Sequence, residues 1–184
     1  MTYEHKVTVV DKPVDATGKV YPYLAFKNEI SQTAGAIVPQ GFEYDLFTQD
    51  PTTRSVTLVG NITPAGVYIE KKGTMYLGSY TKGATHEFAF DAFGTDGIVN
   101  FAGTVIDNTI ESALGKPLDC WVVYLEETSE PNAQNVHQNG TMTMKVYPQL
   151  GYYVELTSEF ETPIPGGFSQ VLMESKITSS NVAL

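Results

Sequence analysis

The part of the sequence that says most about the fold is the stretch Leu118-Asp119-Cys120-Trp121-Val122-Val123-Tyr124-Leu125-Glu126. In a β-strand the odd-numbered side chains from Trp121 to Leu125 would lie on one face, and the even-numbered ones from Cys120 to Tyr124 on the other. Both faces are apolar, which is typical of a strand that is covered on both sides. A β-barrel with a binding interior and a covered outside explains this pattern, and so does the central strand of a packed sandwich.

Similar alternation recurs along the rest of the chain, between clusters of glycine, proline, asparagine and aspartate. It predicts about nine or ten strands of ordinary length. We expect one hairpin over residues 66–80, turned at Lys71-Lys72-Gly73, and another over residues 85–106, turned at Gly94-Thr95-Asp96-Gly97. Other predicted strands include Lys6–Val10, Phe42–Thr48, Arg54–Ile62 and Thr141–Tyr147.

Signals for helices are weak. Leu24–Ala34 could form a short helix and Asn108–Leu114 a single turn, but neither is long or periodic enough to be stable alone. The sequence has no internal repeat or change in composition that would mark a domain boundary. We therefore predict that residues 1–184 form one all-β domain, a single antiparallel β-barrel with an apolar interior lined by aromatic side chains.

The composition is that of a globular protein of ordinary domain size, with 184 residues, 42% hydrophobic and 11% aromatic. The formal net charge of −10 argues against binding to nucleic acids and to anionic membrane surfaces, because both would repel the chain. Cys120 is the only cysteine, so the chain cannot form an intramolecular disulfide. Without a recognisable signal peptide or a long apolar run, we expect a cytoplasmic protein with no membrane insertion.

The motifs of common catalytic sites are absent from the sequence. There is no G-x-S-x-G elbow, no P-loop, no G-x-G-x-x-G after a predicted strand and no H-E-x-x-H. The histidines, His5, His86 and His137, are dispersed and lack the spacing of zinc ligands. We therefore expect neither a metal nor a cofactor.

The strand predicted over Thr85–Phe93 places His86 on one face together with two phenylalanines. If that face turns inward, His86 could donate a proton or a hydrogen bond to a bound molecule, although a rim histidine bonded to a backbone carbonyl explains the pattern as well. Tyrosines in predicted strands offer flat apolar area and a hydroxyl that needs a partner. We assign His86, Tyr76 and Tyr44 as candidate catalytic residues. The candidate substrate-binding residues are Phe42, Tyr68, Phe88, Phe90, Trp121 and Tyr124.

The part of the chain from Phe42 to Gly115 resembles the allene oxide cyclase barrel superfamily, which also includes dirigent proteins and bacterial polyketide cyclases. The similarity lies in Phe42–Phe47 before a turn, in Val59–Gly66 leading into the next strand, and in the hairpin that ends at Ala102-Gly103. Two features depart from the family: its Thr-Gly-Gly segment is Ala113-Leu114-Gly115 here, and the cavity cysteine of the plant enzymes has no counterpart.

The resemblance implies an antiparallel barrel with an apolar cavity, commonly a dimer or a trimer. It also implies that Phe42 and Tyr44 line the pocket and that Asp11 lies near the family's acidic residue. We accordingly expect a homodimer or homotrimer.

Three hypotheses for function follow. The first is a cofactor-free cyclase or isomerase that binds a small hydrophobic natural-product intermediate and orients it for ring closure, such as a pericyclic or cycloaddition reaction. The second is a non-catalytic small-molecule-binding or dirigent-like protein of the same shape. The third is a structural β-sandwich in a larger assembly, in which the aromatic residues are only core.

Overall fold

The computed structural model describes residues 2–34, 42–52, 55–76, 80–91, 98–128, 140–164 and 166–180 of the chain. All regular secondary structure in these ranges is β, which confirms the all-β prediction. No helix in them has the length and hydropathy needed to cross a bilayer. The eleven strands are β1 Thr2–Asp11, β2 Leu24–Ala34, β3 Phe42–Gln49, β4 Val56–Ile62, β5 Tyr68–Tyr76, β6 Thr85–Asp91, β7 Ile98–Ala113, β8 Lys116–Glu127, β9 Gly140–Tyr147, β10 Tyr152–Ile164 and β11 Gly167–Ser180.

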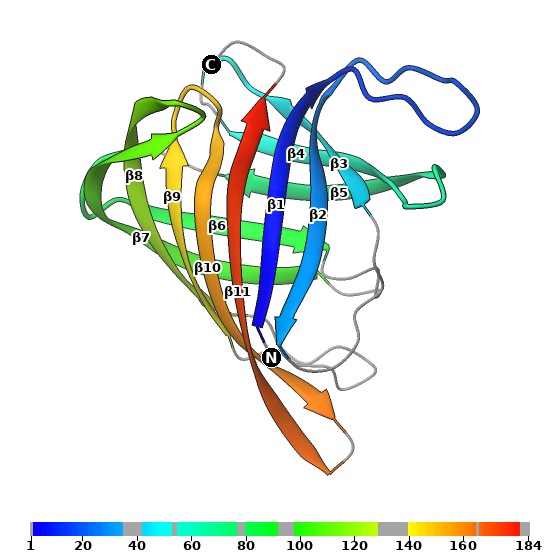
Figure 1. Ribbon diagram of the computed structural model, residues 1–184. Coiled ribbons are helices and arrows are strands. Elements are labelled where there is room, and N and C mark those ends of the chain that lie inside the picture. The colour runs from blue at the N-terminus through cyan, green and yellow to red at the C-terminus, as the bar shows by residue number, and fades with distance from the viewer. Residues whose placement is uncertain are drawn as a thin grey trace.

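The strands pair in chain order within one sheet, and consecutive strands are antiparallel (Figure 1). β1 has a second neighbour, because it also pairs with β11, from Thr2 opposite Leu172 to Val9 opposite Ser180. This last ladder is parallel. The reason is the odd number of strands: when each strand reverses the direction of the one before, the first and the eleventh run the same way. The prediction of antiparallel pairing throughout is therefore wrong for β1 and β11.

Strand β2 occupies the segment Leu24–Ala34, for which the sequence suggested a short helix. It pairs with β1 on one side and with β3 on the other. The predicted helical turn at Asn108–Leu114 is also wrong, since β7 continues to Ala113. In both places the pairing with neighbouring strands outweighs a weak local preference, because strand formation depends mainly on packing against neighbours.

The hairpin turn expected at Lys71-Lys72-Gly73 is wrong as well, because β5 runs through these residues as one strand. Its register with β4 changes at this point: Gly73 lies opposite Leu58, whereas Glu70 lies opposite Gly60. Three residue steps along β5 therefore match two along β4, which is a β-bulge. A glycine in a strand is compatible with a bulge as well as with a turn, so the sequence alone did not separate the two.

The main core lies on the face of the sheet that carries Val7, Phe26 and Val123, which we call the inner face. Buried side chains reach this core from β1 to β4 and from β7 to β11. On β9 every second residue from Met142 to Val146 is buried, and the residues between them are partly exposed. Each such aliphatic side chain stabilises the fold by about 1.5–3 kcal/mol through its burial.

A smaller cluster lies on the opposite face of β2, β3 and β4, and we call it the outer cluster. Residues 12–23, which connect β1 and β2, cover it. The ring of Tyr21 stacks on that of Tyr68 with centroids 4.5 Å apart, and Nζ of Lys19 lies 4.7 Å from the Tyr21 centroid. The apolar outer face of these strands is therefore buried by a loop of the same chain. The outer cluster comprises Tyr21, Ala25, Leu46 and Ile62, with Tyr23, Tyr44, Val59 and Tyr68 packed against them.

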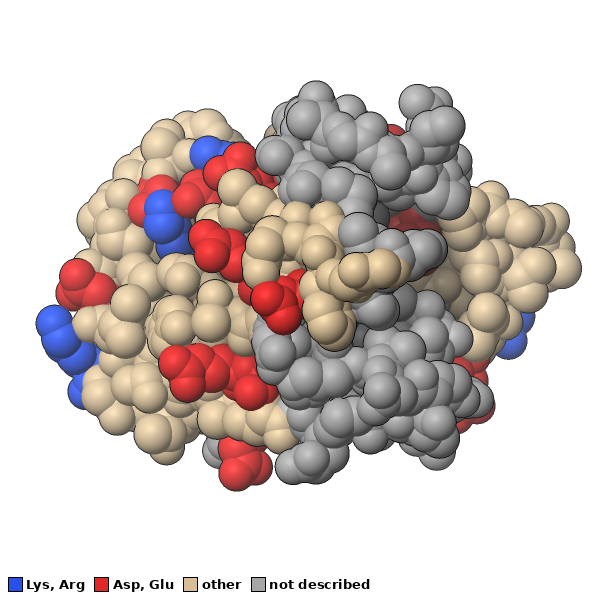
Figure 2. All heavy atoms as spheres, turned by 90° about the horizontal axis from the view of Figure 1, so that it is seen from below, with Lys and Arg blue, Asp and Glu red and all other residues tan. Residues whose placement is uncertain are grey.

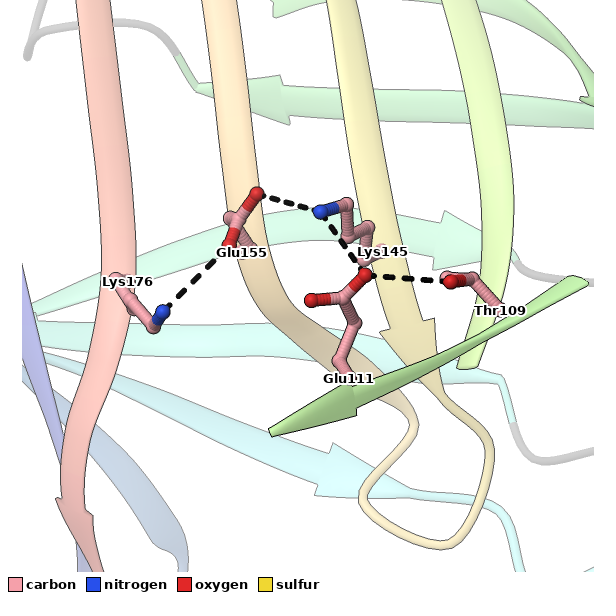
Figure 3. Close-up of polar contacts among 5 residues, drawn as sticks. All are labelled: Thr109, Glu111, Lys145, Glu155 and Lys176. Carbon is pink, nitrogen blue, oxygen red and sulfur yellow. Dashed lines mark hydrogen bonds and ion pairs between the residues drawn. The ribbon is translucent and has the colours of Figure 1, made fainter. Parts of the chain in front are cut away.

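A chain of charged side chains connects β7, β9, β10 and β11 on the outer side of the sheet (Figure 3). Nζ of Lys145 lies 3.0 Å from Oε1 of Glu111 and 2.7 Å from Oε1 of Glu155. Nζ of Lys176 lies 3.7 Å from Oε2 of Glu155. Burial lowers the pKa of Lys145, but its hydrogen bonds to both carboxylates outweigh this and raise the pKa overall. Lys145 thus stays charged and links three strands.

Candidate functional site

Four polar side chains meet on the inner face of β2, β3 and β4, and we call them the polar layer: Asn28, Glu43, Asp45 and Asn61. Asn28 and Asp45 are each two residues from a phenylalanine of the main core, so they share its face. Asn61 lies directly opposite Asp45, and Glu43 lies directly opposite Asn28. The register of the sheet therefore brings together polar groups from three separate strands.

Two side-chain amides hold the carboxylate of Asp45. Nδ2 of Asn28 donates to Oδ2 of Asp45 at 2.6 Å, and Nδ2 of Asn61 donates to Oδ1 at 3.1 Å. The Asn61 amide also donates to Oε2 of Glu43 at 3.3 Å. Both asparagines are buried, with 4% and 3% of their surface exposed, whereas Asp45 is only partly buried. The result is a carboxylate of fixed orientation that keeps some accessible surface.

The pKa of Asp45 is raised to about 6. Burial is the main cause, and the charge of Glu43 adds to it. The hydrogen bonds from Asn61 and Asn28 and the charge of Lys71 act in the opposite direction. Near neutral pH such a group is mostly ionised, yet it accepts a proton far more readily than an ordinary aspartate does. This is the property of a general base.

Aromatic rings lie next to the polar layer on the inner face, and we call Phe26, Phe47, Tyr152 and Tyr153 the aromatic layer. Phe26 is directly opposite Asp45 in the pairing of β2 and β3. Its ring stacks on Tyr152 with centroids 3.8 Å apart, and the Phe47 and Tyr153 rings lie 5.2 Å and 4.3 Å from Tyr152. These rings exclude water from one side of the carboxylate, which explains its desolvation.

The aromatic layer also supplies hydroxyl groups. The hydroxyl of Ser175 donates to that of Tyr153 at 3.1 Å, and Tyr152 and Tyr153 are hydrogen-bonded to each other. Burial raises the pKa of both tyrosines, and the charge of Asp45 contributes to both. Hydrogen bonds from Ser175 and Tyr152 partly offset this rise for Tyr153. Because the Tyr153 oxygen accepts both bonds, its own proton is available for donation.

His86 is a second polar feature of the interior. It is 2% exposed, and it lies opposite Gly103 in the pairing of β6 and β7. Its ring centroid is 6.2 Å from that of Tyr80, a residue packed against the main core. Burial lowers the pKa of His86, so its imidazole is neutral near neutral pH. A neutral imidazole has one nitrogen that donates and one that accepts.

The structure separates the residues that the sequence analysis had selected. His86 is buried, and Trp121 packs against the main core. Tyr44 and Tyr68 belong instead to the outer cluster, under residues 12–23. Tyr124 alternates with buried core residues and directs its hydroxyl to Oε1 of Glu126, at 3.3 Å, on the outer side.

The remaining selected residues are on strands, but their side chains lie outside the part of the chain that the structure describes. These residues are Tyr76, Phe42, Phe88 and Phe90. The family resemblance placed Asp11 near an acidic site residue. In the structure Asp11 lies at the end of β1, half of its side-chain surface is exposed, and its Oδ2 is 3.8 Å from Nζ of Lys12.

Sequence reasoning missed the polar layer because it chose the other face of β3. The family resemblance implied that Phe42 and Tyr44 line the pocket, which would turn Glu43 and Asp45 outward. The structure turns Asp45 inward, because residues 12–23 cover the opposite face. The signal that remained in the sequence was the pair of carboxylates Glu43 and Asp45, two positions apart among the apolar residues from Phe42 to Phe47.

Comparisons with protein-family models, curated proteins and solved structures give no match for this chain. In the ranges that the structure describes, no three side chains among histidine, cysteine, aspartate and glutamate come together as a metal site. The arrangement of the polar and aromatic layers is suited to a reaction in which one group moves a proton and another stabilises the charge that results.

Proposed function

We propose that the sheet acts as a closed barrel whose inner face binds a small hydrophobic molecule with a carbonyl group. On this molecule the protein acts as a cofactor-free isomerase or cyclase. The observation that carries the proposal is Asp45, an oriented carboxylate with a pKa of about 6 beside buried aromatic rings and a tyrosine hydroxyl.

The proposed reaction is proton transfer next to the carbonyl group. The carboxylate of Asp45 takes a proton from the adjacent carbon, and the electrons of the C–H bond move to the carbonyl oxygen as an enolate. The hydroxyl of Tyr153 donates a hydrogen bond to that oxygen. Return of the proton from Asp45 to another carbon of the conjugated system completes an isomerisation. Alternatively, the enolate carbon attacks an unsaturated carbon of the same molecule, and Asp45 protonates the carbanion that remains.

Two further features support this proposal. The amides of Asn28 and Asn61 hold the base in one orientation, which reduces the entropy lost on reaching the transition state. The aromatic layer offers flat apolar contact to a substrate and limits the access of water to the enolate. His86 is a candidate for a second hydrogen-bonding group from β6.

A second candidate function is binding without reaction. The stacked rings of Phe26 and Tyr152 and the neighbouring hydroxyl groups would suit a carrier of hydrophobic molecules equally well. The two functions differ in what Asp45 does: an enzyme needs its proton transfer, whereas a carrier needs only contact.

The decisive experiment uses cyclic enones in D₂O and follows by NMR the exchange of the hydrogens next to the carbonyl group. We expect the protein to accelerate exchange and Asp45→Asn to reduce the rate by about 10²- to 10⁴-fold, the usual contribution of a general base. Asp107→Asn is the matched control, because that carboxylate is 69% exposed and its replacement should leave the rate unchanged.

Binding is measured separately through the fluorescence of Trp121, the only tryptophan, which packs against the main core. Binding with no exchange by the unaltered protein would favour the carrier. Exchange that persists in Asp45→Asn would rule out Asp45 as the base. No binding of any enone would contradict both functions.

A further inference from the structure

The hairpin formed by the end of β10 and the start of β11 extends beyond the rest of the sheet (Figure 1). The pairing of β10 with β9 ends at Phe160 opposite Gly140. The pairing of β11 with β1 begins only at Leu172 opposite Thr2. Between these points β10 and β11 pair with each other, from Glu161 opposite Gln170 to Ile164 opposite Gly167. We call residues 161–164 and 166–171 the arm.

The two edges of the arm differ. Pro163 lies in β10 and has no N–H group, which makes the β10 edge a poor partner for another strand. Ile164 and Gly167 flank a two-residue connection, and such a pair in a hairpin exchanges backbone hydrogen bonds, so the next pair, Pro163 and Phe168, does not. The backbone N–H of Phe168 therefore points away from β10, toward the other edge. Within the described ranges, no strand pairs with β11 on that edge from Gly167 to Ser169. Such an edge is a template for strand addition.

The β11 edge of the arm also lacks the features that normally protect an edge. Phe168 is 67% exposed, the highest value among the exposed large apolar residues of the described part. The sequence contains no charged residue from Thr162 to Met173. By contrast, the whole chain has a net charge of −10, and acidic side chains are prominent on the face from which the arm projects (Figure 2). Two copies therefore meet least repulsion where their arms touch.

We propose that the arm is a dimerisation element that binds the arm of a second copy of this chain. The β11 edges of the two arms pair antiparallel about a twofold axis, so that the order of strands across the contact is β10, β11, β11 and β10. An antiparallel pair of identical strands is self-complementary, as an interface between two equivalent copies requires. The two Phe168 side chains lie close to the axis, and their burial adds apolar contact. This inference is independent of the proposed activity.

The dimer is tested by analytical ultracentrifugation of the full chain between about 1 and 100 µM, since a short contact of this kind gives a weak interface. We expect a concentration-dependent dimer that strengthens with added salt, because salt screens the repulsion between the acidic copies. Phe168→Glu should abolish the dimer by placing two carboxylates near the axis. Ile110→Glu is the control, because Ile110 is 64% exposed but lies on β7, away from the arm. The Ile110→Glu variant should dimerise over the same concentration range as the unaltered protein.

Cross-linking tests the geometry independently of affinity. Cys120 is buried, so Ser169→Cys introduces an accessible thiol into the arm without competition. Mild oxidation of the thiols with oxygen and a copper catalyst should give a covalent dimer, whereas Ser179→Cys, at the other end of the same strand, should stay monomeric. A chain that is monomeric at all concentrations, a trimer, or a dimer insensitive to Phe168→Glu would overturn the proposal. Circular dichroism of each variant shows whether the fold is retained.

Discussion

The side-chain amide of Asn28 donates a 2.6 Å hydrogen bond to Oδ2 of Asp45, diagonally across the pairing of β2 and β3. This bond stabilises the ionised carboxylate and therefore opposes the rise in pKa that burial causes. We expect Asn28→Ala to raise the pKa of Asp45 above its present value of about 6. The measurement is a pH titration of the aspartate carboxyl carbons by NMR.

Asn108→Ala is the matched control for this titration. Asn108 donates to Oδ1 of Asp119 at 2.7 Å, which is also an asparagine–aspartate hydrogen bond but is exposed. Loss of this bond in Asn108→Ala should leave the pKa of Asp45 unchanged. If Asn28→Ala also left the pKa of Asp45 unchanged, the hydrogen bond from Asn28 would not contribute to that pKa.

The raised pKa of Asp45 makes the stability of the fold depend on pH. The folded state holds this proton up to about pH 6, whereas the unfolded chain releases it near the ordinary value of 3.8. The folded state therefore binds more protons between these values, and the contribution of Asp45 to the free energy of unfolding falls as pH rises through them. A shift of this size corresponds to roughly 3 kcal/mol at most.

The test compares urea denaturation of the unaltered protein and of Asp45→Asn at pH values below, within and above this interval. As the pH rises, the unaltered protein should lose stability relative to Asp45→Asn. The difference between their free energies of unfolding should stop changing above the pKa of Asp45 in the folded state. A constant difference across the whole range would show that Asp45 titrates normally in the folded protein.

Lys145 should contribute more to stability than an exposed lysine does. It is 28% exposed and lies between Glu111 and Glu155, so Lys145→Met leaves two neighbouring carboxylates without their shared cation (Figure 3). We expect a loss of about 1–3 kcal/mol in the free energy of unfolding, because two partly buried carboxylates lose the cation that lies between them. Lys82→Met is the control: Lys82 is 73% exposed and 3.8 Å from Asp107, a pair worth about 0–1 kcal/mol. Equal losses in the two variants would contradict this ranking.

Gly60 is required by the packing of the outer cluster. A Cβ atom at this position would overlap the ring of Tyr68, which in turn stacks on Tyr21. We expect Gly60→Ala to cost about 1–3 kcal/mol, the usual effect of overpacking, and to loosen residues 12–23. Thermal unfolding measures the cost, and hydrogen exchange at Thr17 and Lys19 reports on the loop, whose backbone amides donate to Asp15. If the ring is the cause, adding Tyr68→Leu should make the two effects less than additive.

Several features of the fold could be predicted from the sequence because they depend on local pattern. Alternation along Thr141–Tyr147 predicted a strand, and the structure buries every second residue there. The place of His86 within its strand indicated an inward position, and His86 is buried. The apolar pattern on both faces of Cys120–Leu125 indicated a strand covered on both sides, and residues on both faces are wholly or partly buried.

Other features were decided only by the tertiary structure, since they depend on which strands become neighbours. The parallel pairing of β1 with β11 joins the two ends of the sheet and leaves no trace in either segment. The inner face of β3 was set by residues 12–23, which bury Tyr44 and Leu46 from outside and so leave Asp45 to the interior. Alternation specifies two faces of a strand but not which of them meets the core. The sequence by itself therefore indicated most of the strands, whereas the register between them brought Asn28, Asp45 and Asn61 together and created the candidate site.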